Sequence, residues 1–317
     1  MRITILDALT VCQNDLDFET LRDIADLVVY DDTKPAEVTE RARESDIVLT
    51  NKVYIGRNEI DLLPKLKYIG VLATGYNNVD IAYAREKGIT VTNIPAYSTD
   101  SVAQMVFAHI LNVTNDVAHY VSENRNGRWA SSPQFCYADS TMHELSGKRF
   151  GVVGLGNIGM KVAAIANVFG MRVCAVTSKR QEELPDYIEK CDLETIFGSC
   201  NVISLHCPLT DETYGMVCKE LLSCVSPDTI LVNTGRGPLV VERDVADALK
   251  AGRLAAYCAD VLSVEPPSAD NPLFSAPNVY LTPHIAWATF EARQRLRDIA
   301  ISNIVGYVNG KPVNVVN

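Results

Sequence analysis

The stretch Phe150-Gly151-Val152-Val153-Gly154-Leu155-Gly156-Asn157-Ile158-Gly159 begins as an apolar strand and continues into a glycine-rich turn. A helical pattern over residues 160–169 follows the turn, and a second apolar strand over 173–176 follows the helix. In a G-x-G-x-x-G turn between a strand and a helix, the backbone can approach a pyrophosphate and the helix N-terminus can bind it. A lone glycine-rich turn would mean little, but this order of elements at this spacing predicts a dinucleotide-binding domain.

Short apolar strands alternate with helical patterns on both sides of this stretch. In the first third of the chain the strand-like runs lie at 3–6, 27–30, 47–50, 68–72 and 89–92. From the glycine turn onward they lie at 150–153, 173–176, 202–205, 230–233, 256–259 and 279–281. Strands that alternate with helices form parallel sheets with helices on both faces. The two series therefore predict an α/β protein with two doubly wound, parallel-sheet domains.

Length and composition indicate a globular protein that binds neither nucleic acid nor membranes. The 317 residues suffice for about two domains with a core each. Against 39 Asp and Glu, the 29 Lys and Arg leave a net charge of −10, and a negative surface repels phosphate backbones and anionic lipids. No apolar run is long enough for a signal peptide or a membrane span. The nine cysteines form no CxxC pair, so we expect reduced, mostly buried thiols, no metal site and a cytoplasmic location.

Three polar residues, Arg236, Glu265 and His284, each come shortly after one of the last three strands. Taken singly, they would be a surface cation, a solvated acid and a structural histidine. Open α/β sheets bind their ligands at the carboxyl ends of the strands, so we expect these side chains near the dinucleotide. A histidine can deliver a proton near neutral pH, a neighbouring carboxylate favours its charged form, and an arginine can hold a substrate carboxylate through two hydrogen bonds. Together they are what a hydride-transfer enzyme acting on a small keto acid needs.

Four motifs resemble those of the D-isomer-specific 2-hydroxyacid dehydrogenases. They are Glu144-Leu145-Ser146-Gly147-Lys148-Arg149-Phe150, Asn233-Thr234-Gly235-Arg236-Gly237, Ala259-Asp260-Val261 with Glu265-Pro266, and Thr282-Pro283-His284-Ile285-Ala286-Trp287. The Ala-Trp pair after the histidine, together with Thr50-Asn51-Lys52 and Tyr97-Ser98-Thr99, is similar to the glycerate dehydrogenase, or hydroxypyruvate reductase, branch. The resemblance extends over nearly the whole chain, and the ordered set is more specific than any one motif.

The resemblance implies a role for each strand-end residue. Arg236 would bind the carboxylate and carbonyl of the substrate, His284 would be the acid and base, and Glu265 would pair with His284. Asp260 would hold the carboxamide of the nicotinamide ring. We expect further substrate contacts from Lys52, Ala73, Thr74, Gly75 and Trp287. The cofactor is expected to contact the glycine turn and the ends of the neighbouring strands: Gly154, Gly156, Asn157, Ile158, Gly159, Thr177, Ser178, Lys179, Arg180, Cys207, Pro208, Thr234 and Asp260.

The fold of this family implies that the two chain ends form one domain. Residues 1–98 and 286–317 would form a flavodoxin-like substrate domain, and residues 99–285 a Rossmann dinucleotide-binding domain. A discontinuous domain also explains why the helical pattern near the C-terminus has no strand of its own to follow. The two crossings, near 98–101 and 284–287, would act as hinges that close the domains and exclude water.

The expected function is NAD(P)-dependent reduction of a small 2-keto acid to the D-hydroxy acid, with hydroxypyruvate or glyoxylate giving glycerate or glycolate. One alternative is a dinucleotide-sensing, corepressor-like binding protein, which would need only the cofactor pocket. The joint presence of Arg236, Glu265 and His284 favours the enzyme. Among enzymes, oxidation of 3-phosphoglycerate, D-lactate or formate is the nearest alternative.

The strand at 173–176 ends without the acid that many members of the family carry. A Rossmann unit places an acid roughly 20 residues after the glycine turn, where it binds the 2′-hydroxyl of the adenine ribose. Here the hydroxyls of Thr177 and Ser178 can donate to a 2′-phosphate, and Lys179 and Arg180 can neutralise it. The cations could also be a solvated loop pair, partly cancelled by the acids at 182–183. We expect NADPH to be preferred over NADH.

The segment 118–147 carries large aromatic residues in irregular sequence, among them Trp129, Phe135 and Tyr137. Large aromatic side chains outside a periodic element indicate a contact surface. An arm folded back on its own subunit is the alternative. Because the family's usual assembly is a dimer, we expect a homodimer formed through the Rossmann domain, with this segment reaching onto the partner.

Overall fold

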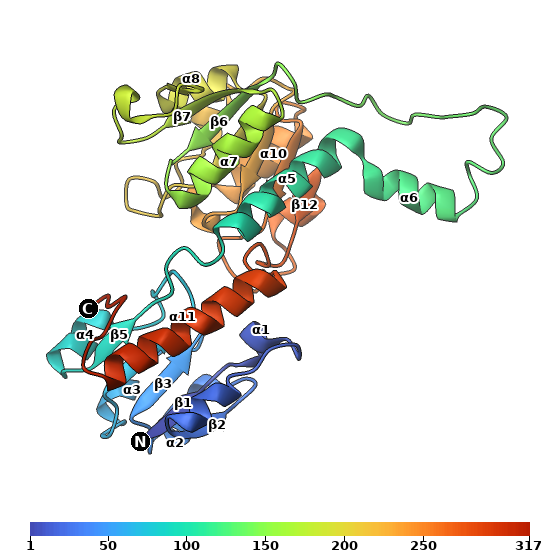
Figure 1. Cartoon of the computed structure of the whole chain (residues 1–317). Coiled ribbons are helices and arrows are strands. Elements are labelled where there is room, and N and C mark those ends of the chain that lie inside the picture. Colours follow the sequence, from blue (N-terminus) through green and yellow to red (C-terminus); the bar gives the residue numbers. More distant parts are fainter. The chain divides into compact units, whose positions relative to one another are not determined.

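The structure is a computed structural model that describes residues 1–317. The chain divides into two units. Met1–Ser98 and Trp287–Asn317 form the first unit, and Thr99–Ala286 form the second (Figure 1). Each unit contains one parallel sheet with helices between the strands, so the predicted α/β class with two doubly wound sheets is confirmed.

Ala286, expected in the substrate domain, lies in the second unit. Its N–H donates to Asp260 Oδ2 at 2.7 Å, and its carbonyl accepts from the Ser101 hydroxyl at 2.5 Å. Because both partners belong to the second unit, the boundary falls one residue later than expected.

The first unit has a five-stranded sheet in the order β2-β1-β3-β4-β5. Its strands are β1 (Arg2–Ile5), β2 (Asp26–Val29), β3 (Ile47–Thr50), β4 (Tyr68–Val71) and β5 (Thr90–Thr92). Its connections contain α1 (Leu9–Cys12), α2 (Val38–Ala42), α3 (Arg57–Asp61) and α4 (Ile81–Glu86), with 3₁₀ turns at Glu19–Asp23 and Pro35–Glu37. From β1 the chain first adds β2 on one side and then β3, β4 and β5 on the other, so the topological switch point lies between β1 and β3. Such sheets bind ligands outside the carboxyl ends of that pair of strands.

The C-terminal helix α11 (Phe290–Val308) packs on this first sheet, as Figure 1 shows. Ala292, Leu296, Ala300 and Ile304 recur every four residues and are buried together with apolar side chains of β1 and β3. This spacing places the four side chains on one face of the helix. The helix at one chain end therefore covers a sheet formed by the other chain end.

The second unit has a seven-stranded sheet in the order β12-β11-β10-β9-β6-β7-β8. Its strands are β6 (Arg149–Val153), β7 (Arg172–Val176), β8 (Ile188–Lys190), β9 (Val202–Leu205), β10 (Ile230–Asn233), β11 (Ala256–Ala259) and β12 (Val279–Leu281). Its helices are α5 (Thr99–Asn115), α6 (Val117–Arg125), α7 (Asn157–Val168), α8 (Leu193–Ser199), α9 (Lys219–Leu222) and α10 (Glu242–Lys250). The edge strand β8 was not predicted, because it has three residues of which only Ile188 is buried.

Apolar side chains fill both faces of the second sheet. Phe150 and Val152 of β6 lie in one buried cluster with residues of α5 and α7, whereas Val153 lies in a second cluster with residues of α8 and α10. Successive strand residues point to opposite faces, so a strand buried on both sides is apolar throughout. The glycine turn after Val153 is thus anchored at the end of a fully buried central strand.

None of the helices combines the length and the apolar character needed to cross a bilayer. All nine cysteines are free thiols. Three of them, Cys174, Cys200 and Cys258, are buried, while Cys136 and Cys224 are exposed and the other four are half-buried. The expectation of mostly buried thiols is therefore correct only in part.

Candidate active site

The glycine turn after β6 has the backbone that the sequence pattern predicts. Gly154 has φ +98°, and a Cβ there would lie 2.6 Å from the backbone nitrogen of Cys207. A Cβ on Gly159 would lie 2.0 Å from the carbonyl oxygen of Gly154. Only glycine fits at these two positions, because a side chain would overlap backbone atoms.

The N-terminus of α7 opens onto the same turn. Gly156 precedes the helix without a side chain that caps it, and a Cβ built on Gly156 would meet no atom within 4 Å. The first N–H groups of a helix have no partner within the helix and carry its positive dipole end. With Asn157 and Ile158 in the first turn, this end of α7 fits an anionic pyrophosphate.

Other expected cofactor residues lie at the same carboxyl edge of the sheet. Cys207 and Pro208 follow β9, beside the glycine turn, and Thr234 follows β10. Thr234 is 8% exposed, and its buried Oγ1 has no hydrogen-bond partner within the protein. A buried hydroxyl without a partner is costly, so it fits a position where a ligand supplies one.

The segment after β7 is much more exposed. Thr177 is half-buried, whereas Ser178, Lys179 and Arg180 are exposed. The Thr177 hydroxyl accepts from the Lys179 N–H at 3.2 Å. Arg180 Nε lies 3.3 Å from Glu183 Oε2, so an acid does partly offset this cation, as the sequence suggested.

His284 and Glu265 form the closest ionisable pair at this edge. His284 Nδ1 lies 2.6 Å from Glu265 Oε2, and Glu265 Oε1 accepts from the Leu262 N–H at 2.9 Å. His284 has φ +55°, and its N–H donates to the Thr282 carbonyl at 2.9 Å. This left-handed conformation is uncommon outside glycine, and such residues gather at functional sites.

Asp260 holds the segment that carries His284. It is 2% exposed and lies just after β11. Its Oδ1 accepts from the Thr282 hydroxyl at 2.6 Å and from the Ile285 N–H at 2.9 Å, and its Oδ2 accepts from the Ala286 N–H at 2.7 Å. The carboxylate therefore fastens this segment on both sides of the histidine.

Arg236 is exposed in the turn after β10, and a neighbouring side chain shapes that turn. Asn233 Nδ2 donates to the Arg236 carbonyl at 2.9 Å, while Asn233 Oδ1 accepts from the Gly235 N–H at 3.1 Å. A Cβ on Gly237 would lie 2.0 Å from the carbonyl carbon of Leu262, so this turn packs directly on the segment that leads to Glu265. The sequence motif alone assigns no role to Asn233, although its place at a strand end before a glycine turn is typical of residues that shape such turns.

The structure thus brings Arg236, Glu265 and His284 to one edge of the second sheet, because β10, β11 and β12 are neighbours. Among the residues expected in the first unit, Lys52 follows β3 and Ala73–Gly75 follow β4, at the carboxyl edge of the first sheet. Trp287 packs edge-on against Tyr97 with ring centroids 6.4 Å apart.

Comparison with known proteins agrees with this arrangement. The family model for the NAD-binding domain of D-isomer-specific 2-hydroxyacid dehydrogenases matches residues 107–286. A hydroxypyruvate reductase of Blautia hydrogenotrophica is 42% identical, and the alignment covers 100% of both chains. A glycerate dehydrogenase of Methylorubrum extorquens is 39% identical over 89% of this chain and 88% of its own.

Among solved structures, an acyclic imino acid reductase in complex with NADPH and D-Arg superposes with a TM-score of 0.86 at 31% identity, over 100% of both chains. The glycine turn, the histidine–glutamate pair and these relatives lead to the same conclusion. The chain belongs to the D-isomer-specific 2-hydroxyacid dehydrogenase family, in its glycerate dehydrogenase and hydroxypyruvate reductase branch, and is a nicotinamide-dependent oxidoreductase.

Proposed function

We propose that the chain reduces hydroxypyruvate or glyoxylate to D-glycerate or glycolate, with His284 as the proton donor. The contact of 2.6 Å between His284 Nδ1 and Glu265 Oε2, at the sheet edge that carries the glycine turn, is the observation that supports this most. Relatives named hydroxypyruvate reductase, glycerate dehydrogenase and glyoxylate reductase favour these substrates. D-lactate and 3-phosphoglycerate are the alternatives among enzymes.

The reduction needs a hydride, which the reduced nicotinamide supplies when bound, and a proton. Addition to the carbonyl carbon leaves an alkoxide, and His284 would protonate it from Nε2, because Nδ1 faces Glu265. The Glu265 carboxylate at Nδ1 would hold the imidazole in the orientation that presents Nε2 to the substrate. In the oxidation direction His284 would take the proton back.

Arg236 would hold the substrate carboxylate and carbonyl through its guanidinium, which suits two parallel hydrogen bonds to a carboxylate. From the first unit, Lys52 and the backbone of Ala73, Thr74 and Gly75 would add substrate contacts, as would Trp287. A dinucleotide-sensing protein is the weaker alternative, because sensing requires no histidine–carboxylate pair.

The dinucleotide would lie with its pyrophosphate at Gly156 and the start of α7, and its nicotinamide near Thr234 and Asp260. A carboxylate has about four lone-pair positions. Asp260 uses three of them within the chain, which leaves one for the carboxamide of the ring.

NADPH would be the preferred cofactor. No acid stands at the end of β7, where Thr177 and Ser178 offer hydroxyls and Lys179 and Arg180 offer positive charge. The similar imino acid reductase was solved with NADPH. The ion pair between Arg180 and Glu183 weakens this preference without adding an acid at the ribose position itself.

The protein would form a homodimer through the second unit, which would explain the exposed side chains of the arm. By the arm we mean α6 and residues 126–147. In Figure 1 the arm extends away from the sheet of its own unit. No residue of α6 is buried, and Trp129 and Phe135 are 54% and 89% exposed. Exposed aromatic residues on an extension of this kind favour a partner surface.

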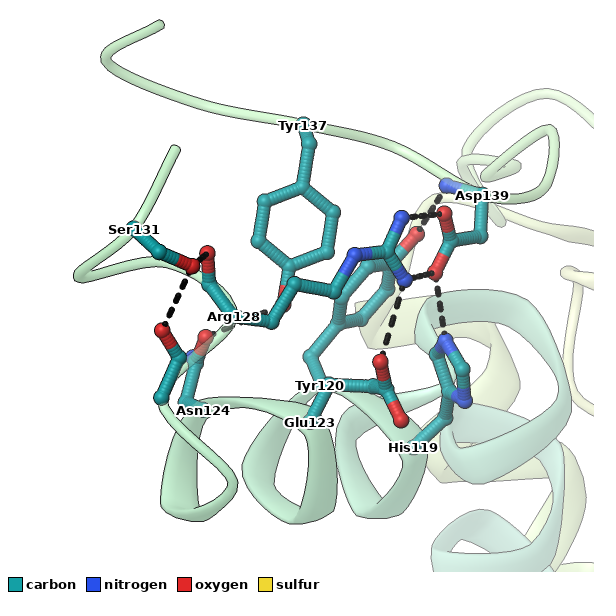
Figure 2. Close-up of polar contacts among 9 residues, drawn as sticks. His119, Tyr120, Glu123, Asn124, Arg128, Ser131, Tyr137 and Asp139 are labelled. Carbon is teal, nitrogen blue, oxygen red and sulfur yellow. Dashed lines mark hydrogen bonds and ion pairs between the residues drawn. The ribbon is translucent and has the colours of Figure 1, made fainter. Parts of the chain in front are cut away.

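Side chains of the arm contact one another, as Figure 2 shows. Arg128 Nη1 and Nη2 each lie 2.5 Å from an oxygen of Asp139, His119 Nε2 lies 2.6 Å from Asp139 Oδ2, and the Arg128 guanidinium lies 4.2 Å from the Tyr137 ring centre. An arm whose side chains contact one another can dock as one piece. Light scattering at micromolar concentration tests the dimer, and a monomer mass would contradict it.

A screen of 2-keto acids with NADPH and NADH tests the proposed activity. We expect hydroxypyruvate and glyoxylate to be reduced with the highest kcat/KM, and faster with NADPH. A chain that binds the dinucleotide but reduces no 2-keto acid would support the sensing alternative instead.

A further inference from the structure

The carboxyl ends of β1 and β3 form the switch point of the first sheet, where ligands of such sheets bind. Two polar residues are buried there. Asp7 lies two residues after β1, and Asn51 lies directly after β3; each is 2% exposed. Neither side chain has a part in the proton transfer described above.

The Asp7 carboxylate reaches across to the segment that follows β3. Its Oδ1 accepts from the Asn51 N–H at 2.8 Å, and its Oδ2 accepts from the N–H groups of Lys52 at 2.6 Å and Val53 at 3.2 Å. Three consecutive amides therefore converge on one buried carboxylate. This fixes the backbone from which the Lys52 side chain extends.

Asn51 continues the connection to the next strand. Its Nδ2 donates to the Leu72 carbonyl at 2.5 Å, and the Leu72 N–H donates to the Thr50 carbonyl at 2.8 Å. Leu72 leads directly into Ala73–Gly75, the other segment of this unit that is proposed to contact the substrate. One chain of hydrogen bonds, from Asp7 through Asn51 to Leu72, thus joins both segments.

A buried carboxylate that is held by backbone amides stabilises a loop only against the free-energy cost of its desolvation. Burial raises the pKa of the Asp7 carboxyl, the three backbone N–H groups oppose that rise, and Asp32 adds to it. Burying a charge without a cationic partner costs free energy that apolar packing would not. The presence of such a group at the switch point of the sheet favours a role in geometry over one in stability.

We propose that Asp7 and Asn51 are positioning residues that hold Lys52 and Ala73–Gly75 in the arrangement that binds the 2-keto acid. This rests on the proposed function, since it takes those two segments to be the ones that contact the substrate. Asp7 would then affect the affinity for the substrate and not the hydride and proton transfer in the second unit.

The first test is Asp7→Asn, which replaces one acceptor oxygen by an amide group that faces N–H donors. A lost hydrogen bond to a charged group predicts a rise in KM for the keto acid on the order of tenfold. The dissociation constant for NADPH and kcat should each stay within about threefold. Thr4→Val is the matched control, because it removes a buried hydrogen bond between β1, the strand that precedes Asp7, and Ser45 without touching residues 51–53.

Asn51→Ala is the second variant, and it removes only the connection to Leu72. It should raise KM several-fold, so the proposal can be judged even if Asp7→Asn fails to fold. In a Lys52→Met background, Asp7→Asn should add less to KM than it does in the parent, because part of its effect acts through Lys52.

Variants at Asp7 and Asn51 that lower the melting temperature as Thr4→Val does, with KM unchanged, would overturn the positioning role and leave the proposed function intact. A parent chain that reduces no 2-keto acid would overturn the proposed function, and this role with it. If Lys52→Met has no effect on KM but Asp7→Asn and Asn51→Ala raise it, the positioning acts through Ala73–Gly75 and stands.

Discussion

Asp7 and Asp260 occupy matching places in two different sheets. Each is 2% exposed, follows a parallel strand by one or two residues, and accepts three hydrogen bonds from the segment after a neighbouring strand. The segment held by Asp7 carries Lys52, whereas the segment held by Asp260 carries His284. With the proposed roles of Lys52 and His284, the same arrangement would serve binding at one edge and chemistry at the other, and the difference would lie in the residue that is held.

The largest effect should come from removing the side chain that Asp260 holds in place. His284→Ala deletes the proposed proton donor, so kcat for keto-acid reduction should fall at least roughly a hundredfold and by up to about ten thousandfold. The dissociation constant for NADPH should hardly change, because the proposed role places the imidazole at the substrate and not at the dinucleotide. Stopped-flow turnover and fluorescence titration of the bound nucleotide measure the two quantities.

His143→Ala provides the control, since His143 is exposed and lies on the arm. It should leave kcat unchanged. Near-normal reduction of hydroxypyruvate by His284→Ala would contradict the proposed role of His284 as proton donor. The interpretation that Asp260 supports a catalytic residue would then fail as well.

Asp260→Asn tests the comparison itself. An amide cannot accept from both backbone N–H groups and the threonine hydroxyl, so the histidine segment loses part of its support. We expect kcat to fall by about ten- to a hundredfold, whereas Asp7→Asn should act mainly on KM. If both variants changed kcat and KM alike, the two aspartates would be general stabilisers of their sheets and not supports of separate tasks.

Glu265→Gln should have a smaller effect. The amide is similar in shape to the carboxylate that lies 2.6 Å from His284 Nδ1 but carries no charge, so the imidazole is held less firmly with Nε2 toward the substrate. We expect kcat to fall about tenfold, with the dissociation constant for NADPH unchanged. A variant that keeps the kcat of the parent would exclude Glu265 as the partner of the histidine.

The sequence was sufficient to predict which residues lie in the segments that follow the strands, because this depends only on local pattern. Arg236, Glu265 and His284 lie in the segments after β10, β11 and β12. The edge strand β8 escaped prediction because three residues with one buried side chain carry almost no periodic signal.

The roles of Asp7 and Asn51 could not be read from the pattern either. Their partners lie across the sheet, and contact with them depends on β1 being the neighbour of β3. Alternation of strands and helices predicts a parallel sheet but does not give the order of its strands.

The smallest effect is expected at the end of β7, where no buried carboxylate holds the segment. Lys179 and Arg180 are exposed, and the Arg180 side chain is 76% exposed and paired with Glu183. Interactions of exposed charges are worth little and are screened by salt. Thr177→Asp combined with Arg180→Ala should therefore shift the ratio of kcat/KM for NADPH to that for NADH by only about fivefold to tenfold toward NADH.

The preference of the parent for NADPH should also decline between low and high ionic strength, whereas the effect of Asp260→Asn on kcat should not. Thr177→Asp alone separates repulsion of a 2′-phosphate from loss of the cation, since it retains Arg180. A parent that favours NADH, or a double variant whose ratio stays where it was, would place recognition of the adenine ribose on residues other than Thr177 and Arg180.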